Sequence, residues 1–290
     1  ALDRSGALYL AKTAFRFRAN PGDELGSIYR SPAGGARIMP ETEARYLYGP
    51  PLWNPDVAGI SARGEILVST FDRERRIGAL YLLRDGRAAL FSGGTPPPGT
   101  EPLLRDPEGA AFDSAGNVYV VDREQGVVVK LDPTGKVLDP YYLRGLGRGR
   151  ALAYDTSGRL WIASDGPLTS PFQDGYGQVW RAGPDGVLTQ VLQGPLPAGL
   201  AVSPGGSVFV ALRRTGKIVV LTPDGGQIEF ANFTTSALRA LAFAPLSDET
   251  RRAGIAGDLF VVTSPRMNFA VSEVIRVSGP FGDFVRRAGR

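Results

Sequence analysis

A short phrase recurs along this chain of 290 residues and constrains its fold more than any other feature. The phrase is a stretch of small and apolar residues, then Asp or Ser, then a turn with Gly, then a β-branched run. Its clearest copies span residues 107–122 and 150–163, and weaker copies span residues 1–11, 56–69, 197–211 and 239–262. The turns are anchored at Asp3, Ser61, Asp113, Asp155, Ser203 and Ala244. Such internal repetition, at intervals of about 40 to 60 residues, is typical of repeat architectures.

Each copy predicts short strands joined by tight turns. Asp or Ser at the anchor supplies a local side-chain hydrogen bond, and the Gly that follows tolerates a positive φ. A second apolar run and another turn follow most copies, as in residues 127–135 and 218–225, and these predict hairpins. Helical periodicity is absent, apart from one possible turn at residues 247–252. We therefore predict an all-β fold, a six-bladed β-propeller of four-stranded antiparallel blades.

The blades of a propeller bury their faces against each other, so we predict a single domain. Its approximate blades are residues 1–50, 51–103, 104–144, 145–192, 193–234 and 235–290. The first copy lacks its front edge, so we expect residues 275–290 to complete a sheet or to lie near Ala1. Because the chain opens inside a strand-like phrase, we expect an upstream signal peptide, an anchor or a truncation.

The chain contains no histidine and no cysteine, which excludes several kinds of chemistry. Disulfides, thiolate nucleophiles, Cys/His metal sites and haem bound through His are excluded. A His general base and the Ser-His-Asp triad are excluded as well. Carboxylates, Lys, Arg, Tyr and cations with oxygen ligands remain. The absence of Cys fits an envelope protein, and we expect an extracytoplasmic location, periplasmic or at the cell surface.

Arginine dominates the basic residues, and the net charge is +4. A GC-rich or thermophilic genome would explain this, and an interaction surface is the alternative. The basic clusters are short and lack interleaved aromatic residues, so we predict no nucleic-acid binding. No apolar run approaches the roughly 18 residues of a membrane span. Association with a membrane would need a segment before Ala1 or a partner.

Residues 106–137 resemble the NHL-repeat propellers in their Pro-Glu-Gly start, Asp-Ser-Ala-Gly-Asn turn, Tyr-Val-Val-Asp strand end and Asp-Pro-Thr-Gly hairpin. The resemblance covers nearly the whole chain and is weak in the first two blades. It implies a six-bladed propeller and, most often, a binding platform. The related family of gluconolactonases and senescence-marker proteins shares the blade pattern and adds a catalytic divalent cation.

The residues five positions before the turn anchors should surround one mouth of the central channel. They are Asp56, Glu108, Arg150, Ala198 and Arg239. In the lactonase family a Glu in a Glu-Gly phrase is a metal ligand, and Glu108 fits that phrase. The resemblance also implies an Asn where this chain has Ala198 and an Asp where it has Leu212.

A calcium site takes about six oxygen ligands. Asp56 and Glu108 could supply some of them, with Asp122 or Asp165 nearby, whereas Arg150 and Arg239 would repel a cation. We therefore predict no cofactor and a mouth closed by salt bridges, with Ca²⁺ or another divalent cation at Asp56 and Glu108 as the alternative. A glycosidase-like pair of acids is disfavoured, because the arginines should lower both pKa values.

Long inter-blade segments carry aromatic and arginine residues that could bind a partner. The candidates are Arg16, Arg18, Tyr46, Tyr48, Trp53, Phe172 and Tyr176. Tyr, Trp and Arg are enriched in interface hot spots, although these aromatics could simply cap the blade ends. We predict a non-enzymatic scaffold that binds protein partners, such as an accessory subunit of an extracytoplasmic or membrane-associated complex. The alternatives are a divalent-metal-dependent lactonase or esterase and a propeller that binds a small ligand or glycan. No catalytic residue is assigned.

Overall fold

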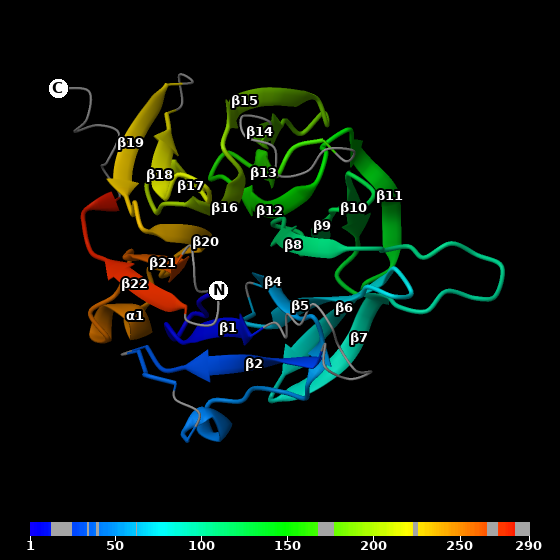
Figure 1. Cartoon of the computed structure of the whole chain (residues 1–290), viewed down its shortest axis with the longest axis horizontal. Coiled ribbons are helices and arrows are strands. Elements are labelled where there is room, and N and C mark those ends of the chain that lie inside the picture. The colour runs from blue at the N-terminus through cyan, green and yellow to red at the C-terminus, as the bar shows by residue number, and fades with distance from the viewer. Residues whose placement is uncertain are drawn as a thin grey trace.

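Six antiparallel sheets surround a central axis in the computed structural model (Figure 1). The structure describes residues 1–12, 25–33, 35–38, 41–61, 63–167, 177–222, 226–265 and 272–281. Strands follow each other within a sheet from the axis outward, and each sheet is a meander of hairpins. The prediction of an all-β, six-bladed propeller is therefore confirmed.

The four middle blades contain four strands each. Blade two comprises β4 (Asp56–Ile60), β5 (Ile66–Asp72), β6 (Ile77–Arg84) and β7 (Arg87–Gly93). Blade three comprises β8 (Pro107–Phe112), β9 (Val118–Asp122), β10 (Val127–Leu131) and β11 (Val137–Arg144). Blade four comprises β12 (Gly149–Tyr154), β13 (Leu160–Ser164), β14 (Gly177–Ala182) and β15 (Leu188–Gly194). Blade five comprises β16 (Pro197–Val202), β17 (Val208–Leu212), β18 (Lys217–Leu221) and β19 (Gln227–Asn232).

The first and last blades differ from the predicted four strands, since each has three in the described part of the chain. Blade one comprises β1 (Leu8–Lys12), β2 (Leu25–Ser31) and β3 (Leu52–Trp53), with the 3₁₀ turn η1 (Glu43–Arg45) before β3. A bridge between Leu2 and Leu8 stands in place of an inner strand. Blade six comprises β20 (Ser236–Phe243), β21 (Leu259–Pro265) and β22 (Glu273–Val277). The helix α1 (Asp248–Arg252) lies between β20 and β21, where one helical turn was predicted.

The core consists of apolar clusters between neighbouring blades. Leu67 and Leu80 of blade two pack with Val120 and Val129 of blade three, and all four are fully buried. Side chains alternate between the two faces of a strand, so each blade contributes to the cluster on either side of it. This arrangement explains why β-branched residues fill the second and third strands.

The ring closes between blades six and one. Leu2 and Leu8 pack against Ile255 and Phe260 in one cluster. Ser247, which caps α1, also donates a hydrogen bond of 2.6 Å from its hydroxyl to the carbonyl of Arg4. Closure therefore uses side-chain packing and one long-range hydrogen bond.

The end of the described chain lies on the other side of blade six. Residues 275–277 belong to β22, so this part of the tail completes a sheet. Phe281 then packs between blades five and six against Phe209, Phe230 and Phe243. No helix in the described ranges is long and apolar enough to span a membrane.

Candidate functional site

The innermost strands of five blades each contain a β-bulge near their first residues, at one end of the central channel. Arg150, Ala198 and Arg239 are each an extra residue opposite the second strand of their blades, and a similar bulge in β8 holds Glu108. In β4 the bulge falls at Ala58, so Asp56 remains in register opposite Ser69. A bulge redirects a side chain relative to the regular ladder. The sequence-predicted mouth residues therefore stand at the starts of five inner strands around the axis.

We call the charged residues gathered here the axial cluster. It contains five acids and five arginines whose charges act on one another: Asp56, Asp106, Glu108, Asp122, Asp165, Arg123, Arg148, Arg150, Arg213 and Arg239. Most of them follow directly on a second strand or open an inner strand, as Arg123, Asp165 and Arg213 follow β9, β13 and β17. Asp106, Arg123, Arg148 and Arg213 were not among the predicted mouth residues. The signal that could have found them is the position immediately after each second strand or before each inner one.

Glu108 is held by two arginines. Its Oε1 accepts a hydrogen bond of 3.0 Å from Arg123 Nη1 and lies 3.5 Å from Arg150 Nη1. Arg123 also contacts Asp106 Oδ2 at 3.2 Å, and Arg150 Nε donates to the fully buried Asp165. The acid side of the axial cluster is thus a chain of ion pairs that fixes Glu108 and Arg150 in place.

Asp56 differs from the other acids of the axial cluster. Its side chain is accessible to solvent, although protein surrounds it on the axial side, and it makes no hydrogen bond or ion pair with the described residues. The pKa of Asp56 is raised to about 8, because surrounding protein disfavours its charge and Glu108 repels it more than Arg150 attracts it. Burial and Glu108 likewise raise the pKa of Asp106 to about 7. Arg150 and Arg123 do lower the pKa of Asp56, as expected, but burial and Glu108 outweigh them, so the expected net lowering is wrong.

The opposite side of the axial cluster is positively charged. Arg239 Nε donates to Ser264 Oγ at 3.0 Å, and Arg213 lies half-buried after β17. Burial, followed by the charges of Arg239 and Arg150, lowers the pKa of Arg213 to about 10. Arg213 and Arg239 therefore lie close enough to repel each other.

The residues of the axial cluster fit a divalent cation poorly. Both arginines that contact Glu108 would compete with a metal for its oxygens. Ala198 and Leu212 carry no oxygen ligand in their side chains, and Leu212 is buried in the apolar cluster between blades four and five. Within the described ranges, no group of three or more acidic residues is arranged to hold a metal ion. We therefore derive no chemistry through a bound cation.

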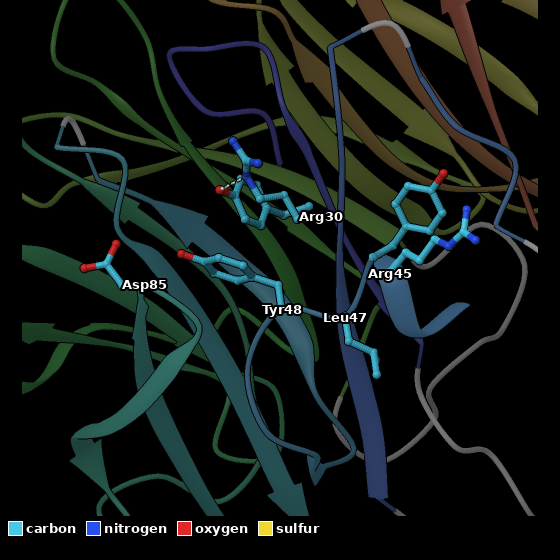
Figure 2. A pocket seen from close by; sticks show the side chains of 7 residues that line it. Arg30, Arg45, Leu47, Tyr48 and Asp85 are labelled. Atoms are coloured by element: carbon cyan, nitrogen blue, oxygen red, sulfur yellow. Dashed lines mark hydrogen bonds between the residues drawn. The ribbon is translucent and has the colours of Figure 1, made fainter. Parts of the chain in front are cut away.

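Two of the predicted partner-binding residues line a cavity at the other end of blade one. The cavity has a volume of about 440 Å³ and is lined by Tyr9, Arg30, Arg45, Tyr46, Leu47, Tyr48 and Asp85. In Figure 2, Asp85 lies to the left of Tyr48 and Arg30 lies above it. Leu47 and Arg45 lie to the right of Tyr48. Trp53 is 42% exposed on β3 and is not part of its lining.

The remaining predicted partner-binding residues, Arg16, Arg18, Phe172 and Tyr176, lie outside the described residues. We call the cavity the blade-one groove. It lies away from the axial cluster, because Asp85 sits in the hairpin between β6 and β7, at the end of the blade opposite Asp56. The two features are therefore separate candidates for a function.

Solved structures with the same fold match this chain along most of its length. A candidate gluconolactonase shares 15% of residues with a TM-score of 0.54, covering 81% of this chain and 78% of that one. A streptogramin B lyase shares 13% with a TM-score of 0.52, covering 93% and 88%. Regucalcin from Agrobacterium tumefaciens, a calcium-binding protein, shares 14% with a TM-score of 0.50, covering 75% and 74%.

Identities this low establish the fold alone: this chain is a six-bladed propeller of the architecture seen in those proteins. No protein-family model matches the sequence. No curated protein matches it either. The site must therefore be interpreted from its own chemistry.

Proposed function

We propose that this protein is a metal-independent hydrolase of small esters or lactones, with its active site at the axial cluster. The matched structures include a candidate gluconolactonase and a streptogramin lyase, so a small-molecule enzyme is the first hypothesis for this fold. The observation that carries the proposal is Asp56, an exposed carboxyl with no partner among the described residues and a pKa near neutrality. This proposal replaces the non-enzymatic scaffold favoured by sequence analysis.

Asp56 suits a general base. A base is most effective when its pKa lies close to the working pH. Ionised Asp56 takes a proton from water as the water oxygen attacks the acyl carbon. It returns that proton to the leaving alkoxide when the tetrahedral intermediate collapses, so one water is consumed and an acid and an alcohol are released.

Arg150 suits the stabilisation of the oxyanion. Its guanidinium is fixed by Asp165 and Glu108, so its orientation is set before a substrate arrives. Preorganised donors aimed at a developing negative charge contribute strongly to catalysis. The acids that hold Arg150, Asp165 and Glu108, serve here as positioning residues.

The test is a panel of esters and lactones assayed with EDTA and, separately, with added Ca²⁺. We expect turnover that is insensitive to EDTA, rises with pH to a midpoint near 8, and falls about 100-fold or more in Asp56→Asn. Asp85→Asn, which removes an acid at the opposite end of blade two, is the control and should retain full activity. Turnover that requires Ca²⁺, or that survives in Asp56→Asn, would refute the proposal.

A second candidate function has its own observation, the exposed Leu47 beside the half-buried Tyr46 and Tyr48 in the blade-one groove. Leu47 is 47% exposed beside Tyr46, and the charged part of the groove carries Arg30 and Arg45. We propose that this surface docks a protein partner that presents an apolar side chain next to an acidic one, at an extracytoplasmic site. Cross-linking from position 47 in the native source tests it, with position 90 (Leu90, 58% exposed) as the control. Equal cross-linking from both positions would count against docking.

A further inference from the structure

On the side of the axial cluster formed by blades four to six, the arginines carry more positive charge than the nearby acids neutralise. Arg150, Arg213 and Arg239 come from blades four, five and six, and their charges act on one another. Asp165 is the acid that attracts Arg213, and it already accepts a hydrogen bond from Arg150. Glu108 is shared between Arg150 and Arg123. One side of the axial cluster is therefore cationic.

Arg213 is the least satisfied of these cations. Its guanidinium makes no hydrogen bond or ion pair with the described residues, although the side chain is half-buried. Its backbone N–H donates to the carbonyl of Leu196 at 2.9 Å, so the residue itself is held in place. A partly buried charge without a partner costs free energy. A negative group supplied by a ligand would remove that cost.

The fifth blade brings no competing side chain to this point. Ala198 occupies the bulge position between those of Arg150 and Arg239, and its side chain ends at Cβ. Leu212, directly before Arg213, is buried in the apolar cluster. Arg213 and Arg239 are thus the charged side chains that blades five and six bring to the axial cluster in the described part of the chain, and Arg239 has the Ser264 hydroxyl beside it.

We propose that Arg213 and Arg239 bind a carboxylate of the substrate. A guanidinium matches a carboxylate through two parallel hydrogen bonds, and two guanidinium groups can share its two oxygens. The inference rests on the proposed function and names its substrate class: an ester or lactone that also carries a free carboxylate. Asp56 and Arg150 act on the acyl group, while Arg213 and Arg239 hold the anionic end.

Calorimetric titration of the full chain with succinate, at low ionic strength, tests the site without relying on turnover. We expect one equivalent to bind, at least tenfold more weakly in Arg213→Gln and Arg239→Gln. The matched control is Arg214→Gln, an exposed arginine in the same turn, whose affinity should stay within twofold of the original. No saturable binding, or equal losses in Arg213→Gln and Arg214→Gln, would overturn the site.

Inorganic phosphate is the second probe. If phosphate binds tenfold more tightly than succinate and depends on the same arginines, the assignment to a carboxylate is wrong. Thermal unfolding of Arg213→Gln without ligand checks that the variant folds, and its midpoint should not fall, since an unpaired charge has been removed. A lowered midpoint would show that Arg213 is a structural residue and would overturn the proposal.

Kinetics separate the failure of this inference from the failure of the proposed function. For an active ester, Arg213→Gln should raise KM at least tenfold for a substrate with a free carboxylate and leave KM unchanged for its neutral amide analogue. If Asp56→Asn abolishes turnover but Arg213→Gln affects both substrates equally, the function stands and the carboxylate site fails. If succinate binding depends on Arg213 but no ester is hydrolysed, the site stands and the hydrolase fails.

Discussion

The indole Nε1 of Trp161 donates a hydrogen bond of 2.9 Å to the carboxylate of Asp155, six residues earlier in the chain. The same relationship joins Tyr119 to Asp113 at 3.2 Å and Tyr9 to Asp3 at 3.1 Å. Where the anchor is Ser203 or Ser61, the residue six positions later is Phe209 or Leu67, which carries no donor. The type of anchor therefore depends on the residue six positions later, in the second strand of the same blade. The anchor is an Asp where that residue is a Trp or Tyr with a hydrogen-bond donor, and a Ser where that residue is a Phe or Leu without one.

Replacing the acid of this pair should destabilise the protein. The Asp155 carboxylate also accepts hydrogen bonds from the backbone N–H groups of Ser157 and Arg159, so Asp155→Ala leaves several donors unsatisfied. We expect a loss of about 2–3 kcal/mol in urea unfolding. Ser203→Ala, at the equivalent position of blade five, should cost about 1 kcal/mol. A loss in Asp155→Ala no larger than in Ser203→Ala would show that the network adds nothing.

Asp56 should reduce stability as the pH rises. An unfolded Asp ionises near pH 4, whereas folded Asp56 has a pKa of about 8. The surrounding protein, Glu108 and Asp106 raise this pKa by more than Arg150 and Arg123 lower it. Between these values the folded state keeps a proton that the unfolded state has lost, so stability falls from pH 4 to pH 8 and then levels off.

Asp56→Asn should therefore be more stable than the original protein above pH 8, with a difference that vanishes toward pH 4. We expect about 1 kcal/mol, because water reaches this carboxyl and screens it. Urea unfolding at several pH values measures the difference, with Asp85→Asn as the control. An unchanged pH slope in Asp56→Asn would contradict a raised pKa.

Phe281 should be a main support of the last blade. It is 4% exposed and meets Phe209 and Phe243 edge to face, with ring centroids 5.8 and 5.3 Å apart. Phe281→Ala should cost about 3–5 kcal/mol, and Phe281→Leu distinctly less. Leu246→Ala, at a 56% exposed position, is the control and should cost under about 0.5 kcal/mol. A small loss in Phe281→Ala would mean that the segment after β22 contributes little to the core.

Two turn glycines should respond differently to the same substitution. Gly135 and Gly158 both have positive φ, at 90° and 75°. A Cβ on Gly135 would lie 2.0 Å from the carbonyl oxygen of Phe91 in the neighbouring blade, whereas a Cβ on Gly158 meets nothing within 4 Å. Gly158→Ala should cost about 1 kcal/mol from backbone strain alone, and Gly135→Ala at least about twice that. Equal losses would show that the blades can separate at Phe91.

The repeat predicts the number of blades, the strand-rich elements and the turn anchors, and local helical periodicity predicts the turn near residue 250. Each of these depends on residues close together in sequence, such as Asp113 and Gly116 of one turn, so local hydrogen bonds and backbone preferences suffice to predict them. In the described part of the chain the first and last blades depart from the repeat, because closure of the ring relies on packing between segments far apart in the sequence, as between Leu8 and Phe260.

The site divides in the same way. The sequence places Asp56, Glu108, Arg150 and Arg239 at the starts of inner strands, because their spacing from the turns is regular. The positions of Arg213 and Asp106 beside strand ends can also be found in the sequence. Their roles cannot, since these depend on which residues of other blades lie beside them around the axis. Nor could the sequence supply the ionisation of Asp56, because the balance between enclosure, Glu108 and Arg150 is set by three-dimensional distances. Interactions between residues close in sequence determine the blades. Which charges lie together, and which carboxyl keeps its proton near neutral pH, depends on the tertiary structure, because the closed ring brings residues of different blades to one place.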